Sequence, residues 1–449
     1  MSAIYSAMAP HLRATQQRRR ELRPAQPRAS EAGGHLYRTR EDGNRLHVVP
    51  CRRTFTAGPR PQGSDPQRPG VQQRSSALVT VDRIIFLCNA LRMGGSQSVF
   101  LRLTRAARDA GFEVILASRG GELAPRFRQE GARIVRIIAR EGAADTGDRS
   151  LAAMTKAAAS LVGVAQVASL VRRPGVLLHA SQPWPVAVAA AAAVGSSAPV
   201  IWHAHGTTAV EMPPAWMSIV RRKSQAWVGI TPEVERALHS VGPGPRTSVI
   251  TLPNPIDTDV PSDEYARPQR GVIGVLSTLT ASKIGYVQAC LLAAAGIAED
   301  GTSVHVRVIG DGPERTRIER ECRDLEMATR SLTITLHGQS VRPWPVLADC
   351  EVVVGMGLVA VEGAIRQHNV VCASSFGLGG RLTTESYETL FDTNFTGRGY
   401  LPVTAPGLKQ VLLDAMESTP DAGLPALVEA KHGAAAAGAW VRTWKRYLS

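Results

Sequence analysis

Beyond about residue 80, short apolar runs alternate with longer stretches whose apolar residues recur every three to four positions. The short runs have the length of buried strands, and the stretches between them have the period of amphipathic helices. The first series predicts strands at 83–88, 113–118, 133–137, 175–179, 200–203, 226–230 and 248–252, with the clearest helices at 96–110 and 122–130. Strands and helices that alternate in this way form a parallel sheet covered on both faces, which is one doubly wound α/β domain.

A segment dense in proline and aspartate, 252–270, interrupts this alternation and predicts a linker. The alternation then resumes, with strands predicted at 272–276, 303–309, 332–337, 351–354 and 370–373 and helices at 282–299, 313–326, 343–348 and 359–366. Two such domains predict a ligand-binding cleft between the carboxyl ends of their sheets. We therefore divide the chain into a tail at 1–80, an N-terminal domain at 81–258 and a C-terminal domain at 259–449.

Most of the net positive charge of the chain lies in the tail. It holds 14 arginines, no lysine and five acids, so it carries nine of the 14 net positive charges of the chain. Its Pro, Gln, Gly and Ser content and its lack of an apolar period predict disorder, because it cannot bury enough surface to offset the entropy of ordering. An arginine-rich arm can bind nucleic acid or anionic lipid, but an extension without a function has the same composition.

The remaining composition indicates a protein of a reducing compartment without a membrane span. The six cysteines are scattered, with no C-x-x-C pair and no histidine at ligand spacing, which argues against a zinc site or a disulfide framework. No apolar stretch of signal-peptide type occurs in residues 1–30. The alanine-rich run at 185–202 is interrupted by Gly, Ser and Pro and is too short to span a bilayer, so it predicts a buried helix followed by a strand.

Gly94 and Gly95 separate the first predicted strand from its helix. Without Cβ atoms, the backbone amides here and the N-terminus of the helix can face an anion or sugar hydroxyls. A plain tight turn would be built from the same two glycines, so the pair alone leaves both interpretations open.

Eight strings, in order, carry a family resemblance: "LRMGGSQSV", "HAHG", "ITPEVERAL", "LPNPID", "STLTASK", "VIGDGPERTRIE", "LHGQ" and "GMGLVAVEGA". From about residue 82 to the C-terminus, the chain resembles the two-domain, Rossmann-like retaining glycosyltransferases of the family 4 type, whose architecture is called GT-B. The resemblance implies transfer of a sugar from a UDP- or GDP-linked donor to an acceptor held by the N-terminal domain, without a metal ion or another cofactor. It also places Gly94 and Gly95 in the loop that contacts acceptor and donor.

The resemblance assigns Lys283 to the donor phosphates and to catalysis. A nucleoside diphosphate gains negative charge as the glycosidic bond breaks, and a fixed cation stabilises that state. The family usually has an arginine at the position of Thr278, so one of two expected phosphate cations is absent from this chain.

A second glycine turn, Gly310-Asp311-Gly312, follows a predicted strand and would let the backbone pass close to the nucleotide. Pro313 is expected in the first turn of the next helix, where its missing amide costs nothing. The "HGQS" turn around Gly338 would supply backbone contacts to the base. Each turn alone is as typical of a structural βα connection as of a binding loop.

Glu362 lies near the start of a predicted helix that follows a glycine-rich turn. The amides of Gly357, Leu358 and Val359 would lie at the positive end of this helix and face the diphosphate or sugar. The carboxylate of Glu362 would accept hydrogen bonds from the ribose hydroxyls. Many relatives carry a second glutamate where this chain has Val354, which puts the handling of the donor sugar in question.

His205 follows a strand end, where the family often places a histidine that faces the reacting sugar. It could donate a hydrogen bond to a sugar hydroxyl, with His203 as the competing candidate and a helix-capping or turn role as the alternative for either. Asn254 starts the linker, where it would fix the hinge through its side chain and could approach the donor. The family commonly has a glycine in place of Pro255.

The expected partners are therefore a nucleotide sugar and a glycan or lipid-linked acceptor, in the cytoplasm or at the inner face of the plasma membrane. Peripheral membrane contact fits such an acceptor, and no specific nucleic acid is expected. The terminal segment 433–449 predicts a helix that packs back toward the N-terminal domain through Trp440, Trp444 and Tyr447, with membrane contact as its alternative. Oligomeric state, sugar, base and linkage stay open.

Two other functions compete with a transferase. The absence of the usual arginine at Thr278 and of the usual glutamate at Val354 would suit a glycosyltransferase-like protein that binds a nucleotide sugar or acts as a scaffold without turnover. A nucleic-acid-binding arm at 1–80 on a metabolic fold is the other.

Overall fold

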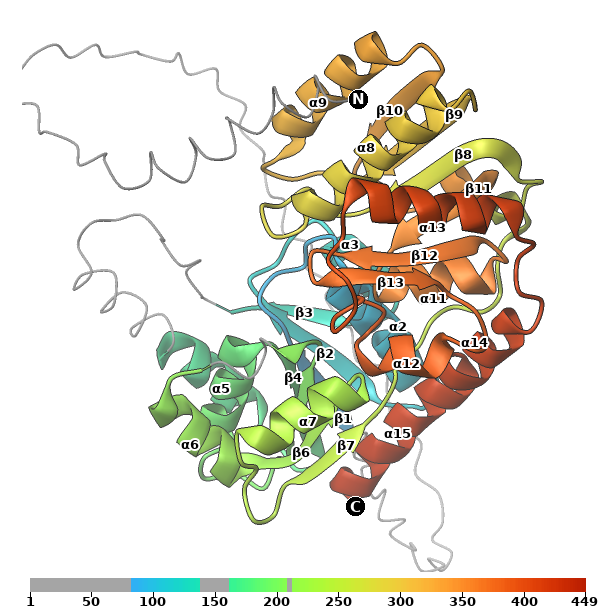
Figure 1. The fold of residues 1–449 in the computed structure, drawn as a ribbon. Helices are drawn as coiled ribbons and strands as arrows, with labels where there is room; N and C mark the ends of the chain where they lie inside the picture. Colours follow the sequence, from blue (N-terminus) through green and yellow to red (C-terminus); the bar gives the residue numbers. More distant parts are fainter. Residues whose placement is uncertain (1–81, 138–160, 208–211) are drawn as a thin grey trace, which may run out of the picture. The chain divides into compact units, whose positions relative to one another are not determined.

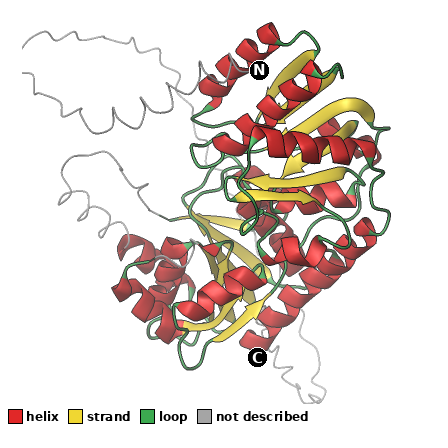
Figure 2. Cartoon of the chain, in the orientation of Figure 1, coloured by secondary structure: helices red, strands yellow, loops and turns green. Residues whose placement is uncertain are grey.

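The structure is a computed structural model that describes residues 82–137, 161–207 and 212–449. Their strands form two groups, each flanked by helices (Figure 2). The predicted tail lies outside the described residues. The two sheets belong to one compact unit, Ser76–Ser449. We call residues 82–251 the N-terminal lobe, 252–268 the linker and 269–432 the C-terminal lobe.

The N-terminal lobe contains a parallel sheet with the strand order β3-β2-β1-β4-β5-β6-β7 (Figure 1). Its strands are β1 (Arg83–Leu87), β2 (Glu113–Ser118), β3 (Arg133–Arg136), β4 (Val176–Ser181), β5 (Val200–Ala204), β6 (Ser224–Gly229) and β7 (Ser248–Thr251). Its helices are α2 (Gly95–Asp109), α3 (Ala124–Gln129), α5 (Pro183–Ala192), α6 (Pro214–Lys223) and α7 (Pro232–Ser240).

This sheet is buried on both faces because its strands are apolar at successive positions. In β1, Ile84 and Phe86 join the core under α2, whereas Ile85 and Leu87 join the core under α5. The period of two along a strand sends neighbouring side chains to opposite faces, so a continuous apolar run feeds two cores. The predicted buried helix of the alanine-rich run is α5, which precedes β5.

The C-terminal lobe repeats this design with the order β10-β9-β8-β11-β12-β13, and its strands are parallel except for β13, which pairs antiparallel with β12. The strands are β8 (Gln269–Leu276), β9 (Val304–Ile309), β10 (Leu332–Gly338), β11 (Cys350–Gly355), β12 (Asn369–Ser374) and β13 (Gly377–Arg381). The helices are α8 (Ile284–Glu299), α9 (Arg315–Ala328), α10 (Trp344–Leu347), α11 (Leu358–Ile365), α12 (Tyr387–Asp392), α13 (Ala405–Glu417) and α14 (Leu424–His432).

Both sheets reverse their strand order at one place, between β1 and β4 in the first and between β8 and β11 in the second. The chain leaves the carboxyl ends of adjacent strands in opposite directions at such a point, which opens a space for a ligand. The loops that follow β1, β8 and β11 contain Gly94, Lys283 and Gly357. The topology thus puts three of the predicted site segments at the two reversal points.

The terminal helix α15 (Ala434–Leu448) packs against α2 and β4 of the N-terminal lobe (Figure 1). Trp440 and Trp444 have no exposed surface and belong to the core under α2. The last helix of the chain therefore completes the core of the first sheet.

Some elements differ from the prediction. Strand β13 was not predicted, because its sequence, GLGGR, contains no apolar run. Helices α12 to α14 were not predicted either. Pro313 was predicted in the first turn of a helix, but α9 starts at Arg315. Residues 312–315 form a turn here, in which the amide of Arg315 donates to the carbonyl of Gly312 (3.0 Å), and the amide of Glu314 donates to the carbonyl of Leu279 (3.0 Å).

None of the helices in the described part of the chain combines the length and the apolar character that a membrane crossing requires. This includes α5, the helix of the alanine-rich run.

Candidate functional site

Three predicted segments of the C-terminal lobe meet at the carboxyl edge of its sheet. The amide of Leu279 donates to the carbonyl of Asp311 (2.9 Å), which joins the loop after β8 to the loop after β9. The amide of Gly310 donates to the carbonyl of Gly338 (2.8 Å), which joins the second loop to the end of β10. The backbone alone thus brings Thr278, the 310–312 turn and Gly338 together.

The two glycines of the 310–312 turn are required by this contact. Gly310 has φ 149° and Gly312 has φ 156°, in the region that favours glycine. A Cβ at Gly310 would overlap the carbonyl oxygen of Ser277, and one at Gly312 would overlap that of Leu279. The turn therefore has a structural reason for its glycines, independent of any ligand.

Lys283 precedes the first residue of α8 and is half-buried. Among the described residues its ammonium group has no ion-pair partner, and desolvation by burial lowers its pKa. The side chain of Thr278 is exposed and adds no positive charge. Ser375 Oγ donates to the carbonyl of Ser282 (2.5 Å), which fixes the loop that carries Lys283 to the turn between β12 and β13.

The turn before α11 differs in detail from the prediction. Of the three amides expected to face an anion, that of Gly357 donates to the carbonyl of Asn394 (3.1 Å) and that of Val359 to Met356 (3.2 Å). Of these three amides, only that of Leu358 has no acceptor among the described residues. Asn394, whose φ is 57°, turns its carbonyl toward the loop. The segment that begins at Asn394 thus supports the start of α11.

The starts of α2 and α11 adjoin, one from each lobe. A Cβ at Gly95 would lie 3.6 Å from Leu358 Cδ1. Neither helix has an acidic residue in its first turn. Because backbone amides carry a positive partial charge at a helix N-terminus, the two ends together favour an anion at this place.

Glu122 connects the loop before α2 to the loop after β10. Glu122 Oε1 accepts from the amide of Met93 (2.8 Å) and from Gln339 Nε2 (3.0 Å). Gln97, near the start of α2, donates through Nε2 to the carbonyl of Ala90 (3.1 Å). A carboxylate could not make this bond, so the amide has a local structural reason.

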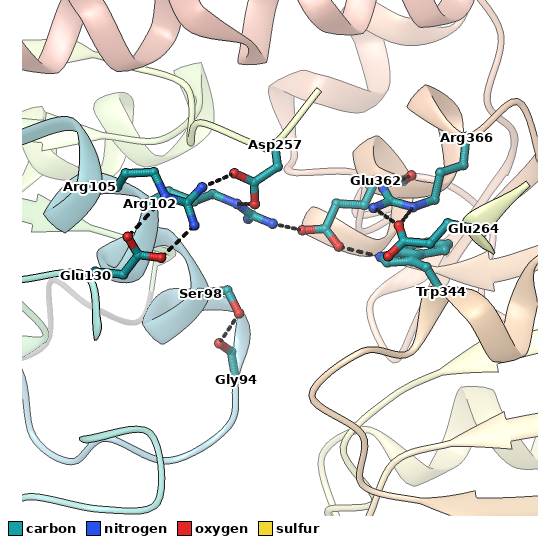
Figure 3. A network of polar contacts seen from close by, with 10 residues as sticks. All are labelled: Gly94, Ser98, Arg102, Arg105, Glu130, Asp257, Glu264, Trp344, Glu362 and Arg366. Carbon is teal, nitrogen blue, oxygen red and sulfur yellow. Dashed lines mark hydrogen bonds and ion pairs between the residues drawn. The ribbon is translucent and has the colours of Figure 1, made fainter. Parts of the chain in front are cut away.

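Glu362 is engaged within the protein. Its Oε1 accepts from Arg102 Nη2 (2.6 Å) of helix α2, and its Oε2 accepts from Trp344 Nε1 (2.8 Å), as Figure 3 shows. The side chains of Arg102 and Glu362 are only 15% and 14% exposed, so this interlobe ion pair is largely shielded from water. A ribose can reach the carboxylate only if Arg102 moves away or shares it.

Arg102 also contacts the linker. Its Nε donates to Asp257 Oδ2 (3.0 Å), and Arg105 Nη1 donates to Asp257 Oδ1 (2.7 Å). Burial alone would raise the pKa of Asp257, but attraction to both arginines lowers it. The Nη1 atom of Arg102 is buried and, within the described part of the chain, has no acceptor.

The second end of this network lies inside the C-terminal lobe. Arg366 lies over the ring of Trp344, 4.6 Å from its centroid, and donates through Nε to Glu264 Oε2 (2.8 Å) (Figure 3). Glu264 and Arg366 are both buried. Linker, α10 and α11 are thus fixed to one another beside Glu362.

His205 lies in an aromatic cluster behind the start of α2. Its ring centroid is 4.0 Å from that of His203 and 6.1 Å from that of Phe100. Its Nε2 atom is buried and has no partner among the described residues. Burial lowers the pKa of His205 to about 4, so the imidazole is neutral at neutral pH and can donate or accept one hydrogen bond.

Asn254 is 8% exposed and lies at the start of the linker, shortly after the end of β7. Its carbonyl accepts from His432 Nδ1 (2.8 Å), a residue of α14. Its side-chain Oδ1 is buried and has no donor within the described ranges.

The structure therefore brings together some of the predicted residues. Thr278, the 310–312 turn and Gly338 meet in the C-terminal lobe, and Gly95 adjoins the start of α11. His205 packs with His203 in the aromatic cluster, and Asn254 lies in the linker. Arg102, Asp257 and Trp344 were missed. Nothing in the local sequence marks them, because their contacts join segments far apart in the chain. In the described part of the chain, no cluster of three or more His, Cys, Asp or Glu side chains could hold a metal ion.

A comparison with family models finds a match over most of the N-terminal lobe. Residues 93–260 match the family described as Glycosyltransferase Family 4. The matched segment runs from the glycine turn before α2 into the linker. No curated protein sequence matches the chain.

Solved structures extend the likeness to both lobes. HepE from Anabaena, in complex with UDP and glucose, is 15% identical over 81% of this chain and 98% of its own, with a TM-score of 0.58. A glycosyltransferase from Rickettsia africae is 12% identical over 82% of this chain and 99% of its own, with a TM-score of 0.60. Sucrose-phosphate synthase from Thermosynechococcus elongatus is 14% identical over 81% of this chain and 98% of its own, with a TM-score of 0.59. The predicted architecture of two Rossmann-like sheets is confirmed, and the fold is GT-B.

Proposed function

We propose that this protein is a retaining, family 4-type glycosyltransferase that transfers a hexose from a UDP- or GDP-linked donor to a glycan or lipid-linked acceptor. The product would be a cell-surface polysaccharide or glycolipid, made in the cytoplasm at the inner face of the membrane. HepE, which shares the fold, has been solved with UDP-glucose. No metal ion is required in this proposal, because protein groups would balance the phosphate charge.

The observation that carries the proposal is the environment of Lys283. A half-buried ammonium group without a carboxylate partner in the described residues is costly unless an anion joins it. It lies in the loop held against the 310–312 turn, at the reversal point of the second sheet. A diphosphate is an anion of suitable size and charge for such a place.

In the proposed reaction, the bond between the anomeric carbon and the phosphate oxygen breaks, and the acceptor oxygen bonds to the same face of that carbon. The departing diphosphate takes the proton of the acceptor hydroxyl, so no separate base is needed. Lys283 and the amides at the starts of α2 and α11 would stabilise the charge that grows on the leaving group.

His205 would donate or accept one hydrogen bond with a sugar hydroxyl. Because its pKa is lowered to about 4 by burial, it would act as a neutral imidazole and would not supply charge. Glu362 would bind the ribose after Arg102 has released one of its oxygens.

The direct experiment is transfer or hydrolysis with a panel of UDP- and GDP-sugars by the purified full chain and by Lys283→Ala. Loss of a charge-assisted phosphate contact is expected to weaken nucleotide binding about tenfold or more and to lower turnover further. Lys431→Ala is a matched control, because Lys431 already pairs with Glu388 (2.8 Å). An activity that both variants retain in full would place the phosphates elsewhere.

A second candidate is a protein that binds a nucleotide sugar without turning it over. It is favoured by Val354, which is fully buried at the position where many relatives have a donor-contacting glutamate, and by the exposed Thr278. Calorimetric titration combined with product analysis separates the two, because a binding protein takes up the donor and releases no free nucleotide.

A further inference from the structure

Two chains of hydrogen bonds approach Asn254, one from each lobe. The first starts at Tyr387, whose hydroxyl lies 2.7 Å from His432 Nε2, and continues from His432 Nδ1 to the carbonyl of Asn254 (2.8 Å). The amide of Ile256 closes the loop by donating to the carbonyl of His432 (2.8 Å). Tyr387 and His432 are buried, so water does not compete for these bonds.

The direction of this chain follows from its chemistry. A carbonyl oxygen only accepts, so His432 Nδ1 must carry a proton. Burial lowers the pKa of His432 to about 4, so the ring is neutral and its Nε2 is an acceptor. Tyr387 must therefore donate, and the chain runs from Tyr387 to Asn254.

The second chain starts at Trp444 of helix α15. Trp444 Nε1, which only donates, lies 3.1 Å from His179 Nδ1, and His179 Nε2 lies 3.1 Å from His203 Nδ1. His179 must therefore accept at Nδ1 and donate from Nε2. Both imidazoles are fully buried, and desolvation by burial keeps the pKa of each well below its usual value, so both are neutral.

It follows that His203 accepts at Nδ1 and carries its proton on Nε2. This Nε2 is buried without an acceptor, and Asn254 Oδ1 is buried without a donor, both within the described ranges. Interaction with the Asn254 side chain raises the pKa of His203, against the larger lowering by burial, which indicates that the two side chains are neighbours. The chain thus ends with an unused donor and an unused acceptor next to each other, which is costly in a buried place unless the two meet.

We propose that Asn254 is a positioning residue at the hinge between the lobes, held at its side chain by the Trp444–His179–His203 chain and at its carbonyl by the Tyr387–His432 chain. A bond from His203 Nε2 to Asn254 Oδ1 would satisfy both of these buried atoms. Because Asn254 would then be fixed from both lobes, closure occurs in one geometry. The catalytic consequence rests on the proposed function; the proton positions do not.

The arrangement also sets the place of His205. Its ring packs on that of His203 at 4.0 Å, and Trp440 packs on the same His203 ring at 4.4 Å. A His203 ring held in one tautomer and one orientation therefore gives His205 a fixed support. The C-terminal helix, which is remote in sequence, would orient a residue proposed to face the sugar.

The proton positions can be measured directly by long-range 1H–15N correlation of histidine side chains in the full chain, without nucleotide. A ring nitrogen with a proton and one without it resonate far apart, so each tautomer is identified. We expect His179 and His203 to carry the proton on Nε2 and His432 to carry it on Nδ1. Resonances are assigned by single His→Gln variants. A parent spectrum with His203 protonated on Nδ1, or His432 on Nε2, overturns the proposal.

A matched pair of variants tests the origin of the second chain. Trp440 and Trp444 are both fully buried on α15 and both pack near His179, but Trp440 Nε1 has no partner among the described residues. Trp444→Phe should shift the ring nitrogens of His179 and His203, whereas Trp440→Phe should leave their tautomers unchanged. If the ring nitrogens of His179 and His203 shift equally in both variants, the shifts reflect only the loss of aromatic packing, and the proposal would be wrong.

Two further variants address the hinge. Tyr387→Phe removes the donor to His432 and should shift the His432 resonances. Asn254→Ala should lower turnover about tenfold with little change in the Michaelis constant of the donor, because alignment and not binding is lost. Unchanged turnover in Asn254→Ala, in a protein that does transfer sugar, overturns the hinge role. The predicted tautomers together with no transferase activity would instead refute the proposed function and leave the two chains standing.

Discussion

Replacement of Arg102 by alanine should strengthen nucleotide binding, although it removes a buried ion pair. Arg102 occupies Oε1 of Glu362 at 2.6 Å, and Trp344 occupies Oε2 at 2.8 Å. Each carboxylate oxygen could accept a second hydrogen bond, but the Glu362 side chain is only 14% exposed, so a ribose hydroxyl gains access to it when one of these donors leaves. The arginine comes from the other lobe and is the donor that lobe movement can remove.

The size of the effect follows from the shielding of the pair. With the side chains only 15% and 14% exposed, a charge-assisted bond of this kind is worth about 1.5–3 kcal/mol. If nucleotide binding must break it, its removal returns this energy to binding, which is about tenfold to a hundredfold in the dissociation constant. The variant should also lose some stability, because Asp257 keeps only Arg105 as a partner.

The assay is calorimetric titration with UDP and GDP at one fixed salt concentration, for the parent, Arg102→Ala and Arg105→Ala. Arg105 is the matched control, since it bonds Asp257 and Glu130 but not Glu362, and its side chain is 41% exposed. Exposed pairs of this kind contribute about 0–1 kcal/mol, so its affinity should stay within about threefold to fivefold of the parent.

Weaker binding by Arg102→Ala would refute this reasoning. The free Nη1 atom of Arg102 would then be a contact to the nucleotide, and the ion pair with Glu362 would be part of the binding site and not its competitor. Equal changes in both arginine variants would point to a general charge effect.

Three further outcomes are expected. Glu264→Ala should lower the free energy of unfolding by about 3–5 kcal/mol in urea titration, because it leaves the buried guanidinium of Arg366 without its carboxylate. Gly310→Ala should lower it by about 3 kcal/mol or more and weaken nucleotide binding, since its Cβ would overlap a backbone carbonyl. Stability should be full above about pH 6.5 and fall as the pH drops toward 4, by about 3 kcal/mol for each buried histidine such as His205 and His432, because the unfolded chain binds these protons first.

Each of these expectations has a control. Glu388→Ala removes an exposed partner of Lys431 and should cost less than about 1 kcal/mol. Gly301→Ala has the same positive φ problem but open space around the added Cβ, so a loss as large as that of Gly310→Ala would remove the steric explanation. His239→Gln, at an exposed position, should leave the acid transition unchanged, and a flat stability profile between pH 6.5 and 4 would contradict the buried neutral histidines.

Sequence patterns predicted the two sheets because parallel strands buried on both faces need continuous apolar runs, as in β1 and β4. The apolar patterns failed to predict elements whose structure depends on contacts with distant segments and not on local sequence preference. The glycine-rich strand β13 is a strand only because it pairs with β12, and the turn before α9 is joined to the loop after β8 by the bond from the Glu314 amide to Leu279. Such features depend on partners that a local window does not contain.

The candidate site also contains some features that the sequence predicts and others that it does not. The alternation of strands and helices predicted that the glycine turns and Lys283 follow strands, and the structure confirms these places. Their role in donor binding came from the family resemblance and stays a prediction. The engagement of Glu362 by Arg102 could not be predicted, since the two residues are 260 positions apart and belong to different lobes. The chain from Trp444 to His203 was hidden for the same reason, since it joins the last helix to two strands of the first sheet.

A crystal structure of the full chain with UDP or GDP tests the central claim most directly, because it locates the pyrophosphate. We predict that the diphosphate lies within hydrogen-bonding distance of Lys283 Nζ, with the starts of α2 and α11 on its other sides and a ribose hydroxyl on Glu362. A nucleotide bound away from the loops after β8 and β11, with Lys283 facing solvent, would contradict it.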